Sequence, residues 1–308
     1  MIYTLTANPA IDYHMDLEET GFVPGLVNRS KREEMFPGGK GLNVSVVLSQ
    51  LGIESMAWGF IAGKTGTLLE ELAVERGCSC DFIRLPEGET RINVKLDCEQ
   101  ETAINGTGPQ IGEAQVNALL EKVRRLQADD IMILSGNLQA CGMNLYETIS
   151  AECAARGVSI IVDTEADNLR TTFAHHPFLI KPNEDELTGV FNSTDRSTAS
   201  IVSLMTKCQD EGVRNILVTM GGDGALLLSE DGSLYHAVVT GTHRVISTVG
   251  AGDSTLAGFL AGMKHYEGQY EDALRLACAA GTATACRKWL CTREEAEAVM
   301  GSISVTRL

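Results

Sequence analysis

Short runs of β-branched and other apolar residues alternate with helical patterns along most of the chain, and this alternation constrains the fold more than any other feature. The runs typical of buried strands are 131–134, 159–162, 178–180 and 215–218. Amphipathic helical spacing lies between them, at 114–126 and 145–156. Strands that alternate with helices form mostly parallel sheets covered on both faces. We therefore predict an α/β fold, with ligands bound at the carboxyl ends of the strands.

Two stretches, about 9–36 and 84–107, depart from this alternation. They are polar and poor in helical patterns, and residues 91–96 alternate polar and apolar as a strand with one exposed face does. We predict that they form a small antiparallel β lid outside the main sheet, carried by a single domain that spans 1–308. An apolar lid face left in water would favour pairing with a second copy of the chain, so we expect a homodimer formed through the lid.

A glycine-rich turn leads into a helix at residues 248–254, which read Thr-Val-Gly-Ala-Gly-Asp-Ser. Glycines let backbone N–H groups approach an anion closely, and unpaired N–H groups at a helix start suit a phosphate or a developing oxyanion. We predict that the helix begins at Ser254 and that Asp253 takes a proton from an acceptor hydroxyl. The alternative is a tight turn in which Asp253 is a plain helix N-cap. The N–H groups of the predicted anion hole are those of Gly250, Ala251 and Gly252.

A second turn of the same kind lies upstream, at residues 37–43. Three glycines surround Lys40, and an apolar helical pattern follows from Val44. Two helix starts suited to anions fit two phosphorylated ligands. Phosphoryl transfer depends mostly on positioning and charge stabilisation, so the pair of turns predicts phosphoryl transfer to a hydroxyl.

The two turns resemble the two signatures of the PfkB, or ribokinase-like, family of carbohydrate kinases. Further segments similar to the family follow in the same order: 8–12, 89–95, 101–106, 181–187 and 218–224. The resemblance covers about residues 1–305, and within the family it is strongest to the 1-phosphofructokinases, with the tagatose-6-phosphate kinases next. It implies a ribokinase-like three-layer sandwich, with a mostly parallel central sheet and a small antiparallel β lid.

The resemblance also implies an activity, which is ATP-dependent phosphorylation of D-fructose 1-phosphate to fructose 1,6-bisphosphate with Mg²⁺ as the metal. Tagatose 6-phosphate is the alternative substrate. A kinase for an unphosphorylated acceptor such as ribose would not need Arg91 and Lys95. The alternative of another class is a non-catalytic sugar-phosphate-binding protein, and the intact Asp253, Gly250 and Gly252 argue against it.

Each motif residue takes a role from the resemblance, beginning with Asp253 as the catalytic base. The residues expected at the sugar phosphate are Asp12, Gly38, Gly39, Lys40, Asn43, Asn137 and Arg91, with Lys95 as a weaker candidate and Arg29 reaching the site of a neighbouring subunit. The residues expected at the nucleotide are Lys181, Asn183, Thr219, Gly221, Gly224 and Gly281. Glu186 is expected to orient Mg²⁺ through water, and its spacing from Asn183 is also that of a capping box.

Two segments depart from the pattern of close relatives. Asn137 and Glu165 each stand where the relatives carry serine. A carboxylate at position 165 would weaken the binding of a phosphorylated sugar unless it points away. The substrate within the family therefore stays open.

Net charge limits the partners of the chain. Among 308 residues, 25 lysines and arginines face 41 aspartates and glutamates, which gives a net charge of −16 and argues against nucleic acid or an anionic membrane. The nine cysteines show no paired Cys-x-x-Cys spacing and no common zinc pattern. The N-terminus has the pattern of neither a signal peptide nor a membrane span. We expect a cytoplasmic enzyme with reduced thiols, whose anionic substrates bind in local basic pockets.

Overall fold

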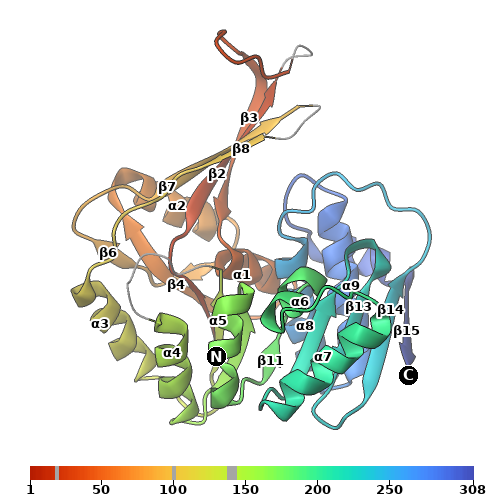
Figure 1. The fold of residues 1–308 in the computed structure, drawn as a ribbon. Coiled ribbons are helices and arrows are strands. Elements are labelled where there is room, and N and C mark those ends of the chain that lie inside the picture. The colour runs from red at the N-terminus through yellow and green to blue at the C-terminus, as the bar shows by residue number, and fades with distance from the viewer. Residues whose placement is uncertain (18–20, 99–101, 137–143) are drawn as a thin grey trace.

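A large central sheet runs through the body of the protein in a computed structural model that describes residues 1–17, 21–98, 102–136 and 144–308 (Figure 1). Its order within the described chain is β15-β14-β13-β12-β11-β10-β9-β1-β4-β5, with β6 paired to β4. The strands are β1 (Ile2–Thr6), β4 (Ser55–Ala62), β5 (Ser79–Cys80), β6 (Ile83–Leu85), β9 (Ile131–Ser135), β10 (Ser159–Asp163), β11 (Leu179–Ile180), β12 (Asn215–Thr219), β13 (Ala225–Leu228), β14 (Leu234–Val239) and β15 (Ile303–Arg307).

The pairing of these strands confirms the predicted mostly parallel sheet. Every neighbour from β5 and β6 across to β12 is parallel, and only the β12–β13, β13–β14 and β14–β15 pairs are antiparallel. The four strand runs predicted from the sequence are β9, β10, β11 and β12. The carboxyl ends of the parallel strands therefore share one edge of the sheet, where the predicted ligand site belongs.

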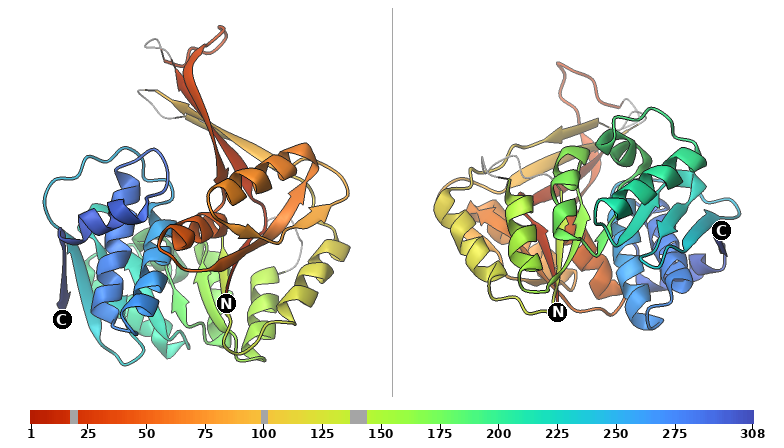
Figure 2. Two further views of the ribbon diagram at one scale, coloured as in Figure 1. Left: turned by 180° about the vertical axis from the view of Figure 1, so that it is seen from behind. Right: turned by 60° about the horizontal axis from the view of Figure 1, so that its bottom comes forward.

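Helices cover both faces of the sheet and give the predicted three layers (Figure 2). Ile133 points into the core under one helical layer, whereas its neighbours Met132 and Leu134 point into the other, as the alternation of a strand requires. The first layer contains α1 (Lys40–Gln50), α2 (Gly63–Glu75), α8 (Ala251–His265), α9 (Tyr270–Ala285) and α10 (Arg293–Met300). The second contains α3 (Glu113–Val123), α4 (Leu145–Ala154), α5 (Ala166–Thr171), α6 (Glu184–Val190) and α7 (Thr198–Asp210). No helix among the described residues is long and apolar enough to cross a membrane.

Helices α8 and α9 pack unusually closely because glycines lie between them. A Cβ atom added at Gly262 would come 2.5 Å from the Cα atom of Ala273 on α9. At Gly258 an added Cβ would come 2.8 Å from the carbonyl oxygen of Leu276. This close contact fixes the axis of α8, whose first turn contributes to the site described below.

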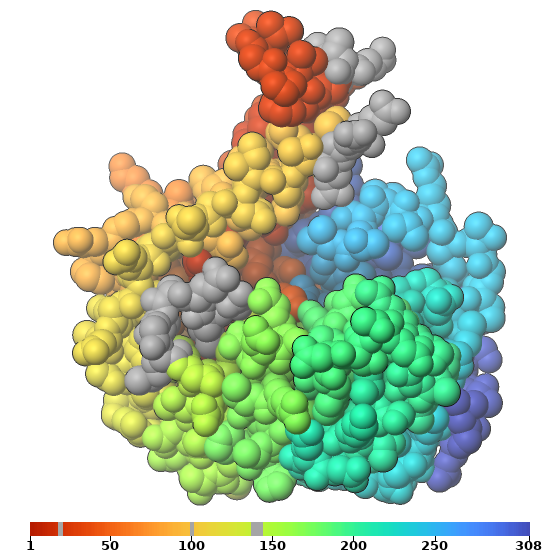
Figure 3. All heavy atoms as spheres, in the orientation of Figure 1, coloured from red at the N-terminus to blue at the C-terminus, as the bar shows by residue number. Residues whose placement is uncertain are grey.

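The predicted lid is a four-stranded sheet that stands away from the body (Figures 1 and 3). Its order is β3-β2-β7-β8, with β2 (Ala10–Leu17), β3 (Ser30–Gly38), β7 (Arg91–Asp97) and β8 (Thr102–Asn105). The outer pairs β2–β3 and β7–β8 are antiparallel, as predicted, whereas the central pair β2–β7 is parallel. A parallel pair needs a crossover connection, and here α1, β4 and α2 supply it.

The lid is fixed to the body through the loop after α9. The ring of Trp289 stacks on Phe36 of β3 with a centroid distance of 4.9 Å, and the guanidinium of Arg76 lies 4.8 Å from the Trp289 ring. Lys288 is ion-paired with Asp16 of β2 and lies 3.7 Å from Asp97 of β7. One short segment therefore contacts three lid strands and holds the lid over the pocket.

The close contact between α8 and α9 predicts the effect of a single methyl group. We expect Gly262→Ala to force the two helices apart and to lower the free energy of unfolding by about 1–3 kcal/mol. The matched control is Gly301→Ala, since a Cβ atom there would meet open space and the backbone conformation suits any residue. Urea unfolding checks both variants. Equal stability of the two variants would contradict the tight packing of α8 on α9.

Candidate active site

One pocket of about 1620 Å³ lies at the carboxyl edge of the parallel strands, under the lid (Figure 3). The ends of β1, β9 and β12 reach it through Thr6, Ser135 and Thr219. It gathers most of the residues predicted for the site: Asp12, Gly39, Lys40, Asn43, Arg91, Lys95, Lys181, Asn183, Glu186, Thr219, Gly221, Gly224, Gly250, Ala251, Gly252, Asp253 and Gly281. Segments far apart in the sequence thus converge on a single cavity.

The C-terminal glycine turn starts α8 three residues earlier than predicted. Gly250 is the N-cap with φ 77°, a left-handed conformation that favours glycine, and the helix begins at Ala251. Asp253 therefore sits inside the first turn, and the alternative that it is the N-cap is wrong. The helix begins earlier than predicted because Gly250 adopts the cap conformation itself, so that no capping side chain is required.

The predicted anion hole is also shifted by one residue. The Ala251 N–H donates to the carbonyl oxygen of Thr248 at 3.2 Å and is not free for an anion. The N–H groups of Gly252 and Asp253 have no partner within the described chain, because the first N–H groups of a helix lack an intrahelical acceptor. These two groups, backed by the helix dipole, form the anion site.

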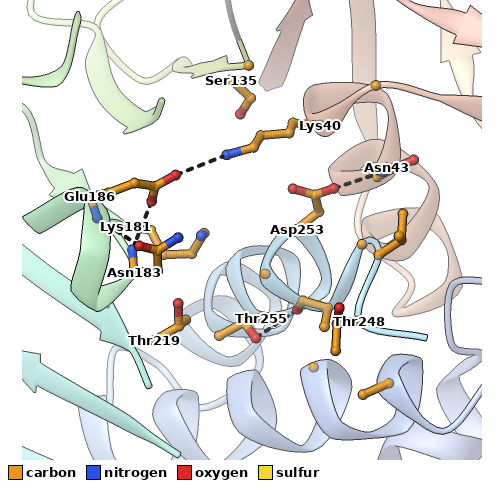
Figure 4. Close-up of a pocket in the computed structure, with 18 of the residues that line it drawn as sticks. Lys40, Asn43, Ser135, Lys181, Asn183, Glu186, Thr219, Thr248, Asp253 and Thr255 are labelled. Carbon is orange, nitrogen blue, oxygen red and sulfur yellow. Dashed lines mark hydrogen bonds and ion pairs between the residues drawn. The ribbon is translucent and has the colours of Figure 1, made fainter. Parts of the chain in front are cut away.

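Asp253 is a buried carboxylate whose side chain faces the pocket (Figure 4). Its Oδ2 atom accepts a hydrogen bond from the Nδ2 atom of Asn43 at 2.8 Å. Burial and the nearby negative charge of Asp163 raise the pKa of Asp253 to about 6, against the opposing effect of Asn43, Lys40 and Lys181. Such a carboxylate is ionised at neutral pH and still basic enough to accept a proton.

Asp163 at the end of β10 organises the positive charges of the pocket. Its side chain is fully buried, and its two oxygens lie 3.2 Å from the Nζ atom of Lys40 and 3.3 Å from that of Lys181. Burial alone would raise the pKa of Asp163, but Lys181 and Lys40 hold it below its ordinary value. Burial alone would lower the pKa of Lys40, but Asp163, Glu186 and Asp253 raise it instead. Lys40 is therefore held charged, and both lysines line the pocket.

Asn183 and Glu186 form the predicted capping box at the start of α6. The N–H of Asn183 donates to Glu186 at 2.8 Å, and the N–H of Glu186 donates to the side chain of Asn183 at 2.8 Å. The Oε1 atom of Glu186 lies 3.7 Å from the Nζ atom of Lys40, so this carboxylate faces the pocket (Figure 4). No group of three His, Cys, Asp or Glu side chains in the described ranges is placed to hold a metal. A single carboxylate such as that of Glu186 is enough for Mg²⁺, because this metal takes few protein ligands and fills its other positions with phosphate oxygens and water.

The N-terminal glycine turn starts α1 with Gly39 as its N-cap at φ 124°. Gly38 does not line the pocket, although the sequence predicted it there. A Cβ atom at Gly38 would come 2.4 Å from the carboxylate of Asp12, so this glycine makes room for the aspartate. Its contribution to the site is indirect.

The lid contributes Asp12 from β2 and Arg91 from β7. The Oδ1 atom of Asp12 accepts a hydrogen bond from the Nδ2 atom of Asn93 at 2.8 Å. Arg91 donates from Nε to the carbonyl oxygen of Asn8 at 3.1 Å and from Nη1 to that of Gly106 at 3.4 Å. Burial lowers the pKa of Arg91 although Asp12 opposes this effect, and an arginine stays charged regardless.

The predicted nucleotide glycines owe their identity to close packing. At Gly224, with φ 93°, an added Cβ would come 2.0 Å from the carbonyl oxygen of Ala237. At Gly281 of α9 an added Cβ would come 2.3 Å from the Oγ1 atom of Thr255 on α8. At both positions along the pocket wall, a side chain would clash with the surrounding protein, so the packing requires glycine.

Three predicted positions fall elsewhere. Arg29 is exposed near the tip of the lid and does not line the pocket of its own chain. Asn137 lies outside the described residues. Glu165 is exposed at the N-cap of α5 and is not among the pocket residues, so it does not bring its charge to the ligand.

Ser135 and Asn93 line the pocket and Asp163 is buried behind its two lysines, and none of the three was predicted for the site. Asp163 and Ser135 follow strands that were recognised, and a polar residue at the carboxyl end of a buried parallel strand is the signal that could have identified them. Asn93 alternates with Arg91 and Lys95 on one lid strand, and that pattern placed it on their face without suggesting a role.

Known proteins are similar to this chain over its whole length. Residues 6–296 match the model of the pfkB family carbohydrate kinases. The chain is 37% identical to 1-phosphofructokinase of Bacillus subtilis and 34% identical to D-tagatose-1-phosphate kinase of Bacillus licheniformis, in each case over the full length of both chains. Among solved structures, a Staphylococcus aureus protein assigned as a phosphofructokinase is 36% identical over 100% of this chain and 99% of its own, with a TM-score of 0.88. Phosphofructokinase-2 of Escherichia coli, at 24% identity over 97% and 98% of the two chains and a TM-score of 0.89, shares the fold.

The raised pKa of Asp253 predicts a pH-dependent effect on stability. Because the carboxyl pKa rises from 3.8 to about 6 on folding, the ionised form destabilises the native state by roughly 3 kcal/mol above pH 6, and this cost disappears as the pH falls toward 4. We therefore expect Asp253→Asn to raise the Tm by a few degrees at pH 8 and to leave it unchanged near pH 4.

The control for this measurement is Asp129→Asn, which removes an exposed carboxylate and is expected to change the Tm little at either pH. Thermal unfolding followed by circular dichroism checks both variants. If Asp253→Asn is no more stable than the wild type at pH 8, the ionised carboxylate of Asp253 does not destabilise the native state.

Proposed function

The chain belongs to the PfkB family of carbohydrate kinases, and on that premise we propose that it transfers the γ-phosphoryl group of ATP to a sugar phosphate, with D-fructose 1-phosphate as the preferred acceptor. As a member of this family it is a phosphotransferase with an alcohol group as acceptor. The observation that carries the proposal is one pocket in which a buried, basic carboxylate lies among two lysines and a free helix N-terminus. The names of the full-length relatives support the choice of acceptor.

In the proposed reaction, Asp253 accepts the proton of the sugar hydroxyl as that oxygen attacks the γ-phosphorus. The new O–P bond forms while the bond between the γ-phosphorus and the β–γ bridging oxygen breaks, and ADP leaves. The N–H groups of Gly252 and Asp253 stabilise the negative charge on the transferring group, and so do Lys40 and Lys181. Asp12 and Asn43 hold the hydroxyls of the sugar.

The nucleotide occupies the end of the pocket opposite the lid in this proposal. Lys181, Asn183, Thr219, Gly221, Gly224 and Gly281 line that end. Glu186 is the residue that would hold Mg²⁺, directly or through water, and the metal would neutralise charge on the ATP phosphates.

The second candidate acceptor is a tagatose phosphate. It rests on the Bacillus licheniformis relative, which is named for tagatose 1-phosphate and not for the 6-phosphate predicted from the sequence. Fructose and tagatose differ at one carbon, so a pocket of the same residues could favour either. A non-catalytic binding protein is disfavoured because Asp253 and the glycine turn are intact and converge on the pocket.

We also propose that the reaction takes place in the cytoplasm. ATP is available there, and seven cysteines of the described residues are free thiols, which is usual in a reducing compartment: Cys78, Cys80, Cys153, Cys208, Cys278, Cys286 and Cys291.

A panel of acceptors tests the proposed reaction. Coupled ADP-release assays with fructose 1-phosphate, tagatose 1-phosphate, tagatose 6-phosphate, fructose 6-phosphate, fructose and ribose should give the highest kcat/KM for fructose 1-phosphate. We expect kcat/KM to fall below about pH 6 as Asp253 becomes protonated, and Asp253→Asn to lose about 10²–10⁴ in kcat. The proposal is wrong if no acceptor is turned over faster by the wild type than by this variant.

Arg91 is the residue that we propose for the phosphate already on the acceptor. Two of its nitrogens are held by the carbonyl oxygens of Asn8 and Gly106, and its Nη2 atom has no partner among the described residues. Because these hydrogen bonds already fix the guanidinium at the pocket, Arg91 loses no further side-chain freedom when a phosphate binds to it. Lys95 lies two residues along the same face of β7 and adds a second positive charge.

Removal of this guanidinium should affect one substrate only. Because a charged hydrogen bond contributes about 1.5–3 kcal/mol, Arg91→Ala should raise the KM for the sugar phosphate roughly 10–150-fold and leave the KM for ATP nearly unchanged. The control is Arg32→Ala, which removes an exposed lid arginine outside the pocket. Equal changes in both KM values for Arg91→Ala would show that the arginine supports the fold of the lid and not the phosphate.

We propose a homodimer in which the outer faces of two lids pack together. Ile92 is 42% exposed and Ile104 is 58% exposed, and both lie on the face opposite Asn93 and Arg91. Val94 pairs with Ile104 on the same face, whereas Leu96, which the sequence assigned to this face as well, is already buried in the single chain. Arg29, exposed at the lid tip, could then reach the pocket of the partner.

The lid dimer is checked by light scattering, which should give about 66 kDa, twice the 33.1 kDa of one chain. We expect Ile92→Glu combined with Ile104→Glu to yield monomers with low kinase activity and faster ATP hydrolysis, because an open lid admits water. Val74→Glu is the control, since Val74 is equally exposed but lies on α2. A wild type that is monomeric at micromolar concentration and fully active would refute this arrangement.

A further inference from the structure

The segment 288–291, between α9 and α10, packs on the turn that carries the proposed base. A Cβ atom added at Gly250 would come 2.6 Å from the Cδ2 atom of Leu290. Leu290 is 5% exposed, so it lies in a buried contact directly against the N-cap of α8. Asp253 follows in the first turn of the same helix. The position of Leu290 and the position of this turn therefore depend on each other.

A chain of buried hydrogen bonds makes a second connection to the same turn. The N–H of Cys291 donates to the Oγ1 atom of Thr284 at 3.0 Å, and the Thr284 hydroxyl shares a hydrogen bond of 2.7 Å with that of Ser254. Ser254 is the residue after Asp253, and both hydroxyl side chains are fully buried. Buried hydrogen bonds are costly to break, so the segment is held firmly on the body.

On its other side the segment contacts the strands that carry Asp12. The ring of Trp289 stacks on Phe36 of β3 with a centroid distance of 4.9 Å and an angle of 15° between the ring planes. Phe36 lies directly opposite Asp12 in the pairing of β2 with β3. Residues directly opposite each other point to the same face of a sheet. Trp289 therefore packs on the cross-strand neighbour of the aspartate proposed to hold the sugar.

Trp289 is the strongest contact between the segment and the lid. The guanidinium of Arg76 lies 4.8 Å from the centre of the Trp289 ring and 5.4 Å from that of Phe36, so one cation contacts both rings. The ion pair of Lys288 with Asp16 lies further out on β2, and its side chains are 40% and 30% exposed. A solvent-exposed ion pair contributes little, whereas stacked aromatic rings bury a large apolar area.

We propose that Trp289 and Leu290 are positioning residues that set the place of Asp12 relative to Asp253. Leu290 is fixed on the turn of the base, and the adjacent Trp289 is fixed on the strand pair of the sugar site. Two consecutive residues thus connect the group that holds the acceptor to the group that deprotonates it. The inference rests on the proposed function, which assigns these roles to Asp12 and Asp253.

Removal of the indole ring tests this role. Trp289→Ala should lower kcat with fructose 1-phosphate by about 10–100-fold, because a reacting group displaced by about 1 Å can lose that much in rate. The KM for ATP should stay within about twofold, since the substitution does not alter the pocket residues proposed for the nucleotide. More ADP should be released per sugar phosphate phosphorylated, because a displaced lid admits water. Trp289→Phe keeps a ring on Phe36 and should recover most of the lost kcat.

The matched control is Tyr270→Ala, which removes another partly buried aromatic ring. Tyr270 contacts the rings of Tyr235 and Phe259, but it lies at the N-terminal end of α9 and outside the pocket. This variant should lose stability in urea unfolding and keep the kcat and the ADP-to-product ratio of the wild type. Lys288→Ala removes a half-exposed group and is the second variant if Trp289→Ala does not fold. It should raise the ADP-to-product ratio in the same direction, by a smaller amount.

The outcomes separate the two proposals. A wild type that phosphorylates no sugar phosphate overturns the proposed function itself. An active wild type whose variants at positions 288 and 289 keep both its kcat and its ADP-to-product ratio overturns only the positioning role. Equal losses of kcat in Trp289→Ala and Tyr270→Ala also overturn that role, because lost stability alone would then explain both.

Discussion

The buried ion cluster around Asp163 is the interaction on which the site depends. Three carboxylates, Asp163, Asp253 and Glu186, lie close to two ammonium groups, those of Lys40 and Lys181, so the cluster carries a net charge of about −1 when every group is ionised. Near-neutrality makes the burial of Asp163, Asp253 and Lys181 tolerable, since isolated charges are costly inside a protein. The same arrangement divides the acids by role: Asp163 is held ionised by the two lysines that it touches, whereas Asp253 touches only an amide and becomes the more basic group.

The fold delivers this cluster because its members come from the carboxyl ends of adjacent parallel strands and the starts of the helices that follow. Asp163 ends β10, Lys181 follows β11, Lys40 begins α1 and Asp253 lies in the first turn of α8. Close packing of α8 on α9 through Gly258 and Gly262 sets the position of that first turn. An anionic ligand therefore meets oriented N–H groups and ammonium groups that the protein has already desolvated, which reduces the reorganisation needed at the moment of transfer.

Much of this arrangement could be predicted from local patterns, and what could not depends on contacts distant in sequence. The strand runs, the capping box of Asn183 and Glu186, and the two glycine turns follow from rules that operate within a few residues. The start of α8 was predicted three residues too late, because a glycine N-cap has no capping side chain that can be recognised in the sequence. The parallel pairing of β2 with β7 and the salt bridge between Lys40 and Asp163 join segments more than 75 residues apart, and no local pattern encodes them. Gly38 resembled a phosphate-binding glycine, but the constraint on it comes from the carboxylate of Asp12.

In the proposed sugar site, the residues that hold the acceptor are divided between the lid and the body, and this division helps to exclude water during phosphoryl transfer. Asp253 and Asn43 belong to the body, whereas Asp12 and Arg91 belong to the lid. In the proposed binding mode neither half presents a complete set of partners, so the hydroxyls and the phosphate of the acceptor are satisfied together only when the lid stands over the pocket. The base then meets its acceptor in the geometry that also excludes solvent. Trp289, which stacks on Phe36, and Lys288, which pairs with Asp16 near the outer end of β2, tie the lid to the body, so Asp12 and Arg91 are held over the pocket.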